Sequence, residues 1–370
     1  MQVAEGLKRR MAEQALRLGD RFLSVREVSE EFKVSMVTAH KALQILCRQG
    51  WLTSEKGRGS FVKQIPVPSG NLKPIAVWSG NPDESLQGDT YRGHILLGMQ
   101  QELAQHNLAL RFIQATIKEN DWSELEAVIR DMSGEIGGVI TFPTFGKKLF
   151  LDFLDSLKLS WIAINQVDHL ARFNFVASDY YQGALEAGEL MAKGGARNFW
   201  IYEHNIQMYQ ATLRLRGFHD GLIRQALVQP EVRIEKLADF RDAVAYEHTQ
   251  KLLKTAGHPD AIFCAGDHLA IGAMKACQDA GLNVPQDVSI IGFTGLELCR
   301  YTTPSLTVAA LPMEEIGRQA ALRLLAVQQE ASRRVDGLIL PTTLIVREST
   351  RPITPDQVRN QKLNQEAYLQ

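Results

Sequence analysis

The side chains best suited to chemistry in this 370-residue chain are basic ones near its N-terminus. A Gly-rich basic turn contains Lys56 and Arg58, and Arg26 and Lys41 precede it. Such cations hold phosphate oxygens rather than break bonds. Residues 1–64 contain 12 Lys and Arg against 7 Asp and Glu, a net charge of +5, whereas the other 306 residues contain 29 against 35, a net charge of −6. This asymmetry indicates that one end of the chain binds nucleic acid.

Catalytic and metal-binding motifs are missing from the sequence. It contains no G-x-S-x-G, H-E-x-x-H or P-loop pattern and no G-x-G-x-x-G after a strand, and its 9 histidines are scattered. We therefore expect no enzyme activity, no cofactor and no metal. Cys47, Cys264, Cys277 and Cys299 lie in apolar or helical contexts without metal-ligand spacing, so we expect buried, reduced thiols.

The elements that position the basic residues can be read from residues 23–62, which have the order helix, turn, helix, hairpin. Ser24 and Glu27 have the spacing of a capping box. Ser35 is a suitable N-cap for the second helix, and Gly50 is a suitable left-handed end for it. Apolar positions at helical spacing in that helix are expected to face the core, namely Val37, Ala42, Leu43, Leu46 and Cys47.

This order predicts a winged helix-turn-helix whose second helix enters the major groove of double-stranded DNA. Outward residues of that helix would face base edges, and basic residues around it would contact phosphates. A solvated helical domain without a partner is the alternative, and the charge asymmetry argues against it. The predicted DNA-binding residues are Arg26, Ser35, Met36, Thr38, His40, Lys41, Lys56 and Arg58.

The same stretch resembles the GntR family of bacterial transcription regulators. The resemblance is carried by L-S-V-R-E-V from residue 23, V-S-M-V-T from 34, G-W-L from 50 and G-R-G-S-F-V from 57. It implies a DNA-binding domain over residues 1–64. The proline that usually follows the position of Leu23 is missing, and Met36 and His40 stand where the family often has arginine. We therefore expect an atypical operator sequence.

From residue 73 onward, strand-like apolar runs alternate with helical patterns. This alternation predicts an α/β fold with parallel sheets, in which ligands bind at the carboxyl ends of the strands. The length of residues 73–350 favours two sheets facing a cleft rather than one. We expect a linker at 65–72 before this domain and a polar tail at 351–370 after it. Strands are expected at 74–79, 109–114, 137–142, 160–165, 198–202, 231–237, 260–265 and 287–293, and helices at 91–106, 121–132, 146–157, 180–194, 214–227, 240–256, 267–281 and 312–330.

Residues 73–350 resemble the effector-binding core of the LacI/GalR family, which is itself similar to periplasmic sugar-binding proteins. The resemblance is carried by G-L-N-V-P-Q-D-V-S-I-I-G-F over 281–293, P-S-L-T from 304 and R-E-S-T from 347. It implies a two-lobed, type I periplasmic-binding-protein-like fold with an effector site between the lobes. It also implies dimerisation through this domain.

The resemblance implies effector-binding residues position by position. The arginine of the family's R-x-x-G-F motif falls on Arg214, for which a helix-surface charge is the alternative. The Asn-Asp pair that usually follows the F-C-A strand stands here as Gly266-Asp267, and Thr294 replaces the aspartate after the G-F string. An amide and a carboxylate that would hold a diol are therefore absent.

Residues at other strand ends complete the predicted effector site. Asn165 could offer an amide. Trp78 and Ser79 end the first strand of the domain, where the indole could stack on a sugar ring; core packing is the alternative for Trp78. Since Arg214 is left without the family's carboxylate, we expect an acidic, phosphorylated or modified sugar as effector. Weaker candidates for the site are Tyr91, Phe142 and Tyr209.

Together these features predict a bacterial transcription regulator, a repressor rather than an activator, that acts as a homodimer on a palindromic operator. Effector closure of the lobes would change its DNA affinity. A carbohydrate-sensing binding protein with reduced DNA-binding function is the alternative, and a cleft enzyme is a third hypothesis. No run approaches the ~20 apolar residues that span a bilayer, and no signal-peptide pattern is present, so we expect a cytoplasmic protein without a membrane partner.

Overall fold

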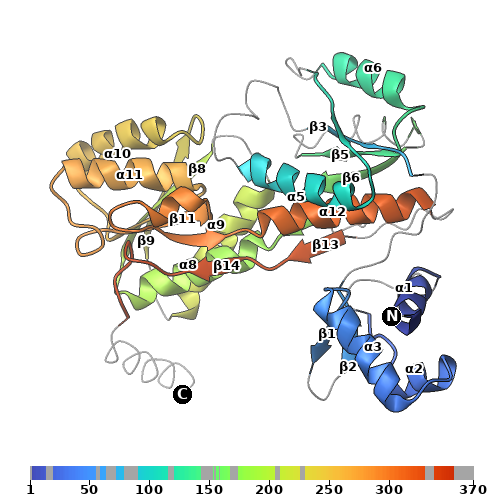
Figure 1. Cartoon of the computed structure of the whole chain (residues 1–370). Helices are drawn as coiled ribbons and strands as arrows, with labels where there is room; N and C mark the ends of the chain where they lie inside the picture. Colours follow the sequence, from blue (N-terminus) through green and yellow to red (C-terminus); the bar gives the residue numbers. More distant parts are fainter. Residues whose placement is uncertain are drawn as a thin grey trace.

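The computed structural model shows a winged helix-turn-helix head and two α/β lobes (Figure 1). No helix among its described residues is long and apolar enough to cross a membrane. The structure describes residues 2–13, 20–55, 59–63, 72–78, 91–115, 121–142, 153, 156–157, 159–166, 174–204, 209–225, 230–329 and 337–353.

The head contains α1 (Gln2–Glu13), α2 (Val25–Glu31), α3 (Met36–Arg48), β1 (Leu52–Glu55) and β2 (Gly59–Val62). Its local signals act as predicted. Ser24 and Glu27 form a reciprocal capping box, Ser35 caps α3, and Gly50 has a φ of 80°. The strands of the wing pair antiparallel. The core contains Leu7, Met11, Phe22 and Val28, together with Ala39, Ala42, Leu43 and Leu46 of α3.

One prediction for α3 is wrong, because Val37 is 65% exposed. The buried stripe of the helix begins at Ala39 and recurs at three- and four-residue steps. At 100° per residue, Val37 lies on the opposite side of the helix from Ala39. It is therefore an outward residue rather than a core residue.

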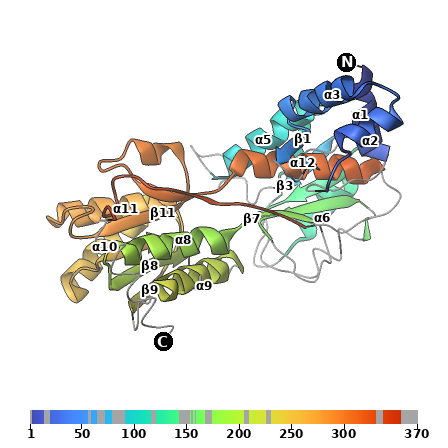
Figure 2. The same cartoon turned by 90° about the horizontal axis from the view of Figure 1, so that it is seen from below.

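The N-terminal lobe is built on a six-stranded sheet in which all described pairings are parallel. Helices α5 (Tyr91–Gln105) and α12 (Met313–Gln329) lie side by side on one face, and α6 (Ser123–Met132) lies on the other (Figures 1 and 2). The strand order is β13 (Gly337–Leu340), β7 (Phe175–Ser178), β6 (Ser160–Ile164), β5 (Gly138–Thr141), β3 (Ile75–Trp78) and β4 (Leu110–Phe112).

Helices α5 and α12 approach each other through two glycines. A Cβ atom added at Gly317 would lie 1.8 Å from the carbonyl oxygen of Ile95, and one added at Gly98 would lie 1.9 Å from that of Glu314. These positions have no room for a side chain, so glycine is required by the close backbone contact.

The C-terminal lobe has a second six-stranded sheet, parallel except for β14 against β12. Helices α8 (Tyr180–Lys193) and α9 (Tyr209–Arg224) cover one face, and α10 (Asp242–Ala256) and α11 (Asp267–Asp279) cover the other (Figures 1 and 2). A 3-10 helix, η1 (Glu297–Arg300), follows β11 (Ser289–Thr294). The strand order is β14 (Thr343–Ile345), β12 (Thr307–Ala310), β11 (Ser289–Thr294), β10 (Ala261–Cys264), β8 (Asn198–His204) and β9 (Glu231–Leu237).

Within the described residues the chain passes between the lobes after β7, after β12 and between β13 and β14. Two of these crossings are joined by hydrogen bonds. The Asp179 N–H donates to the Leu340 carbonyl over 2.8 Å, and the Thr342 hydroxyl donates to the Asp179 carbonyl over 2.8 Å. The first residue of α8, Tyr180, is therefore anchored directly beside the junction of the lobes.

The predicted α/β fold with two parallel-stranded sheets is confirmed. Four short strands, β7, β12, β13 and β14, and helix α1 were not predicted, and α9 begins at Tyr209 rather than at residue 214. Most of the predicted helix over 146–157, the linker at 65–72 except Leu72, and most of the tail lie outside the described residues. The four cysteines are free, and Cys264, Cys277 and Cys299 are buried.

Candidate functional site

The carboxyl ends of strands from both sheets meet in one connected network. Glu203 is the last residue but one of β8 in the C-terminal lobe, and Asn165 follows β6 in the N-terminal lobe. The Asn165 amide donates to the Tyr91 hydroxyl at the start of α5, and the Gln210 amide of α9 donates to the Asn165 carbonyl. Because Gln210 belongs to the other lobe, this network links the two halves of the domain.

A buried ion pair lies at the centre of the network. Arg214 donates from Nε to Glu203 Oε1 over 2.7 Å and from Nη2 to Oε2 over 2.8 Å, and both side chains are buried. Burial opposes the charge of Arg214, but Glu203 more than offsets this and raises the pKa of Arg214. Among the described residues no hydrogen bond is found from Nη1, the third nitrogen of the guanidinium.

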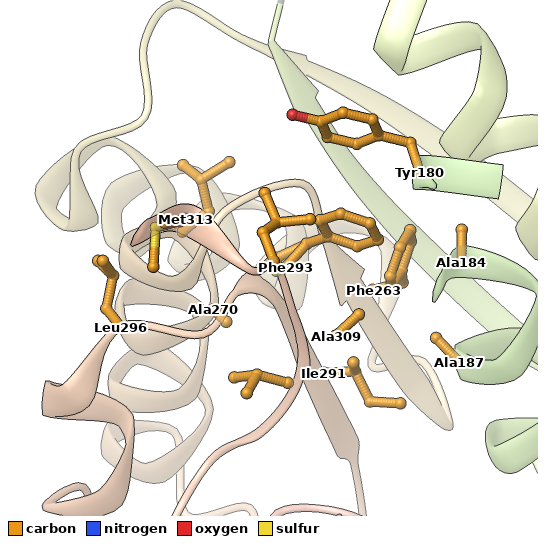
Figure 3. Close-up of a cluster of buried hydrophobic side chains, with 14 of the residues drawn as sticks. Tyr180, Ala184, Ala187, Phe263, Ala270, Ile291, Phe293, Leu296, Ala309 and Met313 are labelled. Carbon is orange, nitrogen blue, oxygen red and sulfur yellow. The ribbon is translucent and has the colours of Figure 1, made fainter. Parts of the chain in front are cut away.

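Two aromatic rings support the guanidinium. Tyr180 and Phe293 stack with ring centroids 5.6 Å apart, and Arg214 Cζ lies 5.5 Å from each centroid. Figure 3 shows Phe293 between Tyr180 and Phe263, at the top of the hydrophobic core. Burial raises the pKa of Tyr180, whose hydroxyl shares a hydrogen bond with that of Tyr91. Both hydroxyls therefore stay protonated and neutral.

A second aromatic pair lies at the ends of β8 and β9. The rings of His204 and Phe240 stack with centroids 4.9 Å apart and an interplanar angle of 17°. A Cβ atom at Gly266 would lie 3.1 Å from the Phe240 ring. Gly266 therefore leaves room for an aromatic ring where the family resemblance implied an amide, and the ring offers a face for stacking.

Asp267 and Thr294 use their side chains to support the protein itself. Asp267 Oδ2 accepts hydrogen bonds from the N–H groups of Gly295 over 2.8 Å and Leu296 over 2.7 Å. Burial raises the pKa of Asp267, against the lowering effect of these donors. The Thr294 hydroxyl donates to the Phe293 carbonyl. Both residues fix the turn after β11, which positions Phe293.

The remaining predicted effector residues divide between core and site. Trp78 is buried, donates from its indole to the Ala115 carbonyl over 3.2 Å and packs edge-on against Trp122. It therefore packs in the core, as the alternative reading of this residue expected, and does not face a ligand. Asn165 Oδ1 accepts from the Ser178 N–H over 2.9 Å, which orients its amide toward Tyr91. Phe142 is buried in the core, Tyr209 is partly exposed at the start of α9, and Ser79 lies outside the described residues.

Sequence reasoning did not identify Glu203, Phe240, Tyr180 and Gln210, and it weighed His204 only as a lone histidine near the cleft. A signal was present for Glu203 and His204, since an apolar strand that ends in Glu-His places polar groups at a carboxyl end. Phe240 gave a weaker one, as a lone aromatic in the polar D-F-R-D segment after an edge strand. No sequence pattern pairs Glu203 with Arg214, because their contact depends on how α9 packs against β8.

A second candidate surface lies on the head, at the start of α3. Met36, His40 and Lys41 are exposed there, beside the exposed Val37. The Ser35 hydroxyl accepts from the Thr38 N–H over 3.2 Å, which caps the helix, and it lies 2.9 Å from the Thr38 hydroxyl, with which it shares a hydrogen bond.

The predicted phosphate-binding cations differ in how they are held. Arg26 forms an ion pair with Glu30 over 2.9 Å, whereas Lys41 has no ion pair among the described residues. Lys56 and Arg58 lie outside the described residues. Lys41 is therefore the predicted cation whose charge is uncompensated in the described part of the head.

Comparisons with known proteins match both parts of the chain. Residues 1–62 match the model of bacterial regulatory proteins of the gntR family, and residues 188–350 match that of the periplasmic binding protein-like domain. The ribose operon repressor of Haemophilus influenzae is 33% identical over 168 residues, which are 45% of this chain and 50% of the relative. The Probable HTH-type transcriptional repressor ExuR of Bacillus subtilis is 28% identical over 207 residues, which are 55% of this chain and 61% of the relative.

The chain thus aligns with about half the length of the curated relatives it matches. Among solved structures, a LacI family transcriptional regulator from Enterococcus faecium with bound ribose has the same fold. It superposes with a TM-score of 0.64 at 22% identity, over 76% of this chain and 100% of that one. This chain therefore joins a gntR-type helix-turn-helix domain to a periplasmic-binding-protein-like domain with the fold of LacI-family regulators.

Proposed function

We propose that this chain is a DNA-binding transcription regulator, acting as a repressor, whose operator affinity is set by an uncharged, carbohydrate-like effector. The observation that carries the proposal is the buried network around Arg214, which joins both lobes of a domain attached to a basic winged helix. A ligand bound there contacts both lobes and stabilises one lobe arrangement over another, which couples it to the head. The names of the matched relatives, both repressors, agree with this role.

The ion pair supports an uncharged effector. The expectation of an acidic or phosphorylated sugar depended on an uncompensated Arg214, and the contact with Glu203 removes its basis. The pair carries no net charge, and the tyrosines beside it are neutral. A hydroxyl oxygen can accept from Arg214 Nη1 and a sugar ring can stack on Phe240, whereas an anion would find no net positive charge at the neutralised guanidinium.

Titration calorimetry of the full chain against paired ligands tests this effector class. Neutral monosaccharides are expected to bind at least about tenfold more tightly than their uronates or phosphates, because an anion would lose its hydration without gaining a net positive partner. In the Phe240→Ala variant the affinity for the neutral ligand should fall, and in Arg216→Ala, an exposed neighbour of Arg214, it should not. Equal or tighter binding of the phosphorylated forms would contradict the proposal.

DNA binding is tested by salt titration of the full chain with a duplex. Lys41→Ala is expected to flatten the slope of log affinity against log salt by about 0.9 for each α3 that contacts DNA, since one phosphate contact is lost. The matched control is Lys275→Ala, because that lysine is exposed on α11 and pairs with Asp279. An affinity that does not depend on salt would instead favour a carbohydrate-binding protein with reduced DNA-binding function.

We further propose that two chains pair through residues 73–350, act in the cytoplasm and read a palindromic operator. A single winged helix reads a short half-site, so specificity requires two heads. Large apolar side chains remain exposed on this domain: Phe112 on β4 and Ile234 on β9, the edge strands of the two sheets, and Leu97 and Ile223 on the preceding helices. Sedimentation of the complex formed in the salt titration gives the number of chains per duplex.

A further inference from the structure

The exposed surface at the start of α3 is partly apolar. Within the described part of residues 2–63, Met36 and Val37 are the large apolar side chains that remain exposed, at 51% and 65%. They are adjacent in the first turn of the helix, and both side chains are exposed in the described part of the head. Single exposed apolar residues need no explanation, but two together at one helix end form a small surface of their own.

This apolar surface is continuous with polar groups that suit DNA. His40 lies four residues after Met36, and Lys41 lies four residues after Val37, so each pair shares a helix face. The head carries a net charge of +5 over residues 1–64. The hydroxyls of Ser35 and Thr38 hydrogen-bond each other, and the Ser35 oxygen also caps the helix. The apolar groups that the first turn can offer to base edges are the thioether chain of Met36 and the two methyl groups of Val37.

On this basis, which rests on the proposed DNA-binding function, we propose that Met36 and Val37 read the 5-methyl groups of thymines in the major groove. The thymine methyl is the apolar feature of that groove, and apolar side chains contact it. Val37 forms no side-chain hydrogen bond and the Met36 thioether accepts only weakly, so neither residue identifies guanine or adenine. Hydrogen-bonded readout in each half-site then falls to the polar side chains of the same helix end, Ser35, Thr38, His40 and Lys41.

The test begins with operators selected by the full-length protein from random-sequence duplexes. Selected sequences should contain thymines at fixed positions in each half-site. Each thymine is then replaced by deoxyuridine, which removes the methyl and keeps every hydrogen-bonding group. At the contacted positions affinity should fall about fourfold per methyl, the effect of returning one buried methyl-sized group to water. Replacement in both half-sites should give roughly a 16-fold loss, since distant effects add.

Protein variants assign the methyl dependence to these side chains. In Met36→Ala with Val37→Ala, the loss on deoxyuridine substitution should shrink to less than about twofold. Val37→Thr, which keeps the shape and replaces a methyl with a hydroxyl, should weaken the dependence in part. Both residues are exposed, so these variants should fold. The inference is overturned if deoxyuridine does not change the affinity for the selected operator. It is also overturned if the methyl dependence persists in the double alanine variant. Either result leaves the proposed DNA-binding function standing. Selection of no sequence overturns the DNA-binding function and the inference together.

Discussion

Replacing Glu203 with alanine is expected to lower the free energy of unfolding of the C-terminal lobe by about 3–5 kcal/mol. Glu203 is fully buried and accepts two hydrogen bonds from Arg214, which is 4% exposed. The variant leaves a guanidinium in the interior without its counter-ion. Urea unfolding of the full chain, followed by hydrogen exchange at β8 and α9, reports on this lobe directly.

Two variants separate the loss of the pair from a general weakening of the region. Arg216→Ala removes a 76% exposed arginine from the same helix, and its pairing with Asp220 at 3.8 Å is worth at most about 1 kcal/mol. Glu203→Leu combined with Arg214→Met replaces the pair with apolar side chains and should recover much of the lost stability. If Glu203→Ala cost less than about 1 kcal/mol, the pair would not be desolvated.

Gly317→Ala is expected to destabilise the N-terminal lobe by about 3 kcal/mol. The added Cβ atom would lie 1.8 Å from the Ile95 carbonyl oxygen. Because that oxygen belongs to the backbone of α5, no side-chain rotation relieves the overlap, and the two helices must move apart. The higher helix propensity of alanine, worth about 1 kcal/mol, acts in the opposite direction and is outweighed.

Gly134→Ala is the matched control. A Cβ atom there meets nothing within 4 Å, so the free energy of unfolding should change by less than about 0.5 kcal/mol. Thermal and urea unfolding of both variants measure the difference. Equal stability of Gly317→Ala and the unaltered protein would show that α5 and α12 do not meet at this glycine.

The sequence was sufficient wherever the signal is local. The capping box at Ser24 and Glu27 and the left-handed Gly50 depend on neighbours within a few residues, and they formed as predicted. The short strands were not predicted, because they form through pairing with strands that are distant in the sequence. The T-V-A-A segment of β12 has little strand character of its own and becomes a strand because it pairs with β11 and β14.

The candidate site depended on contacts that no local pattern carries. A motif identified Arg214, but its charge state in the site is decided by Glu203, which reaches it from another element. Val37 was placed in the core because it is apolar, and its helical angle puts it outside. Trp78 stands at a strand end, yet its ring turns away into the packing around Trp122.

The internal neutralisation of Arg214 by Glu203 also makes ionic strength a means of separating the two halves of the proposed regulator. A site with a dipole and no net charge attracts an uncharged ligand equally well in dilute and concentrated salt, since mobile ions screen exposed charges and reach buried pairs poorly. Phosphate contacts, by contrast, lose strength steeply as salt rises. Effector affinity can therefore be measured at high salt with the head detached from DNA, and at low salt with the head attached. The ratio of the two affinities is the coupling constant between the sites, obtained without altering a single residue.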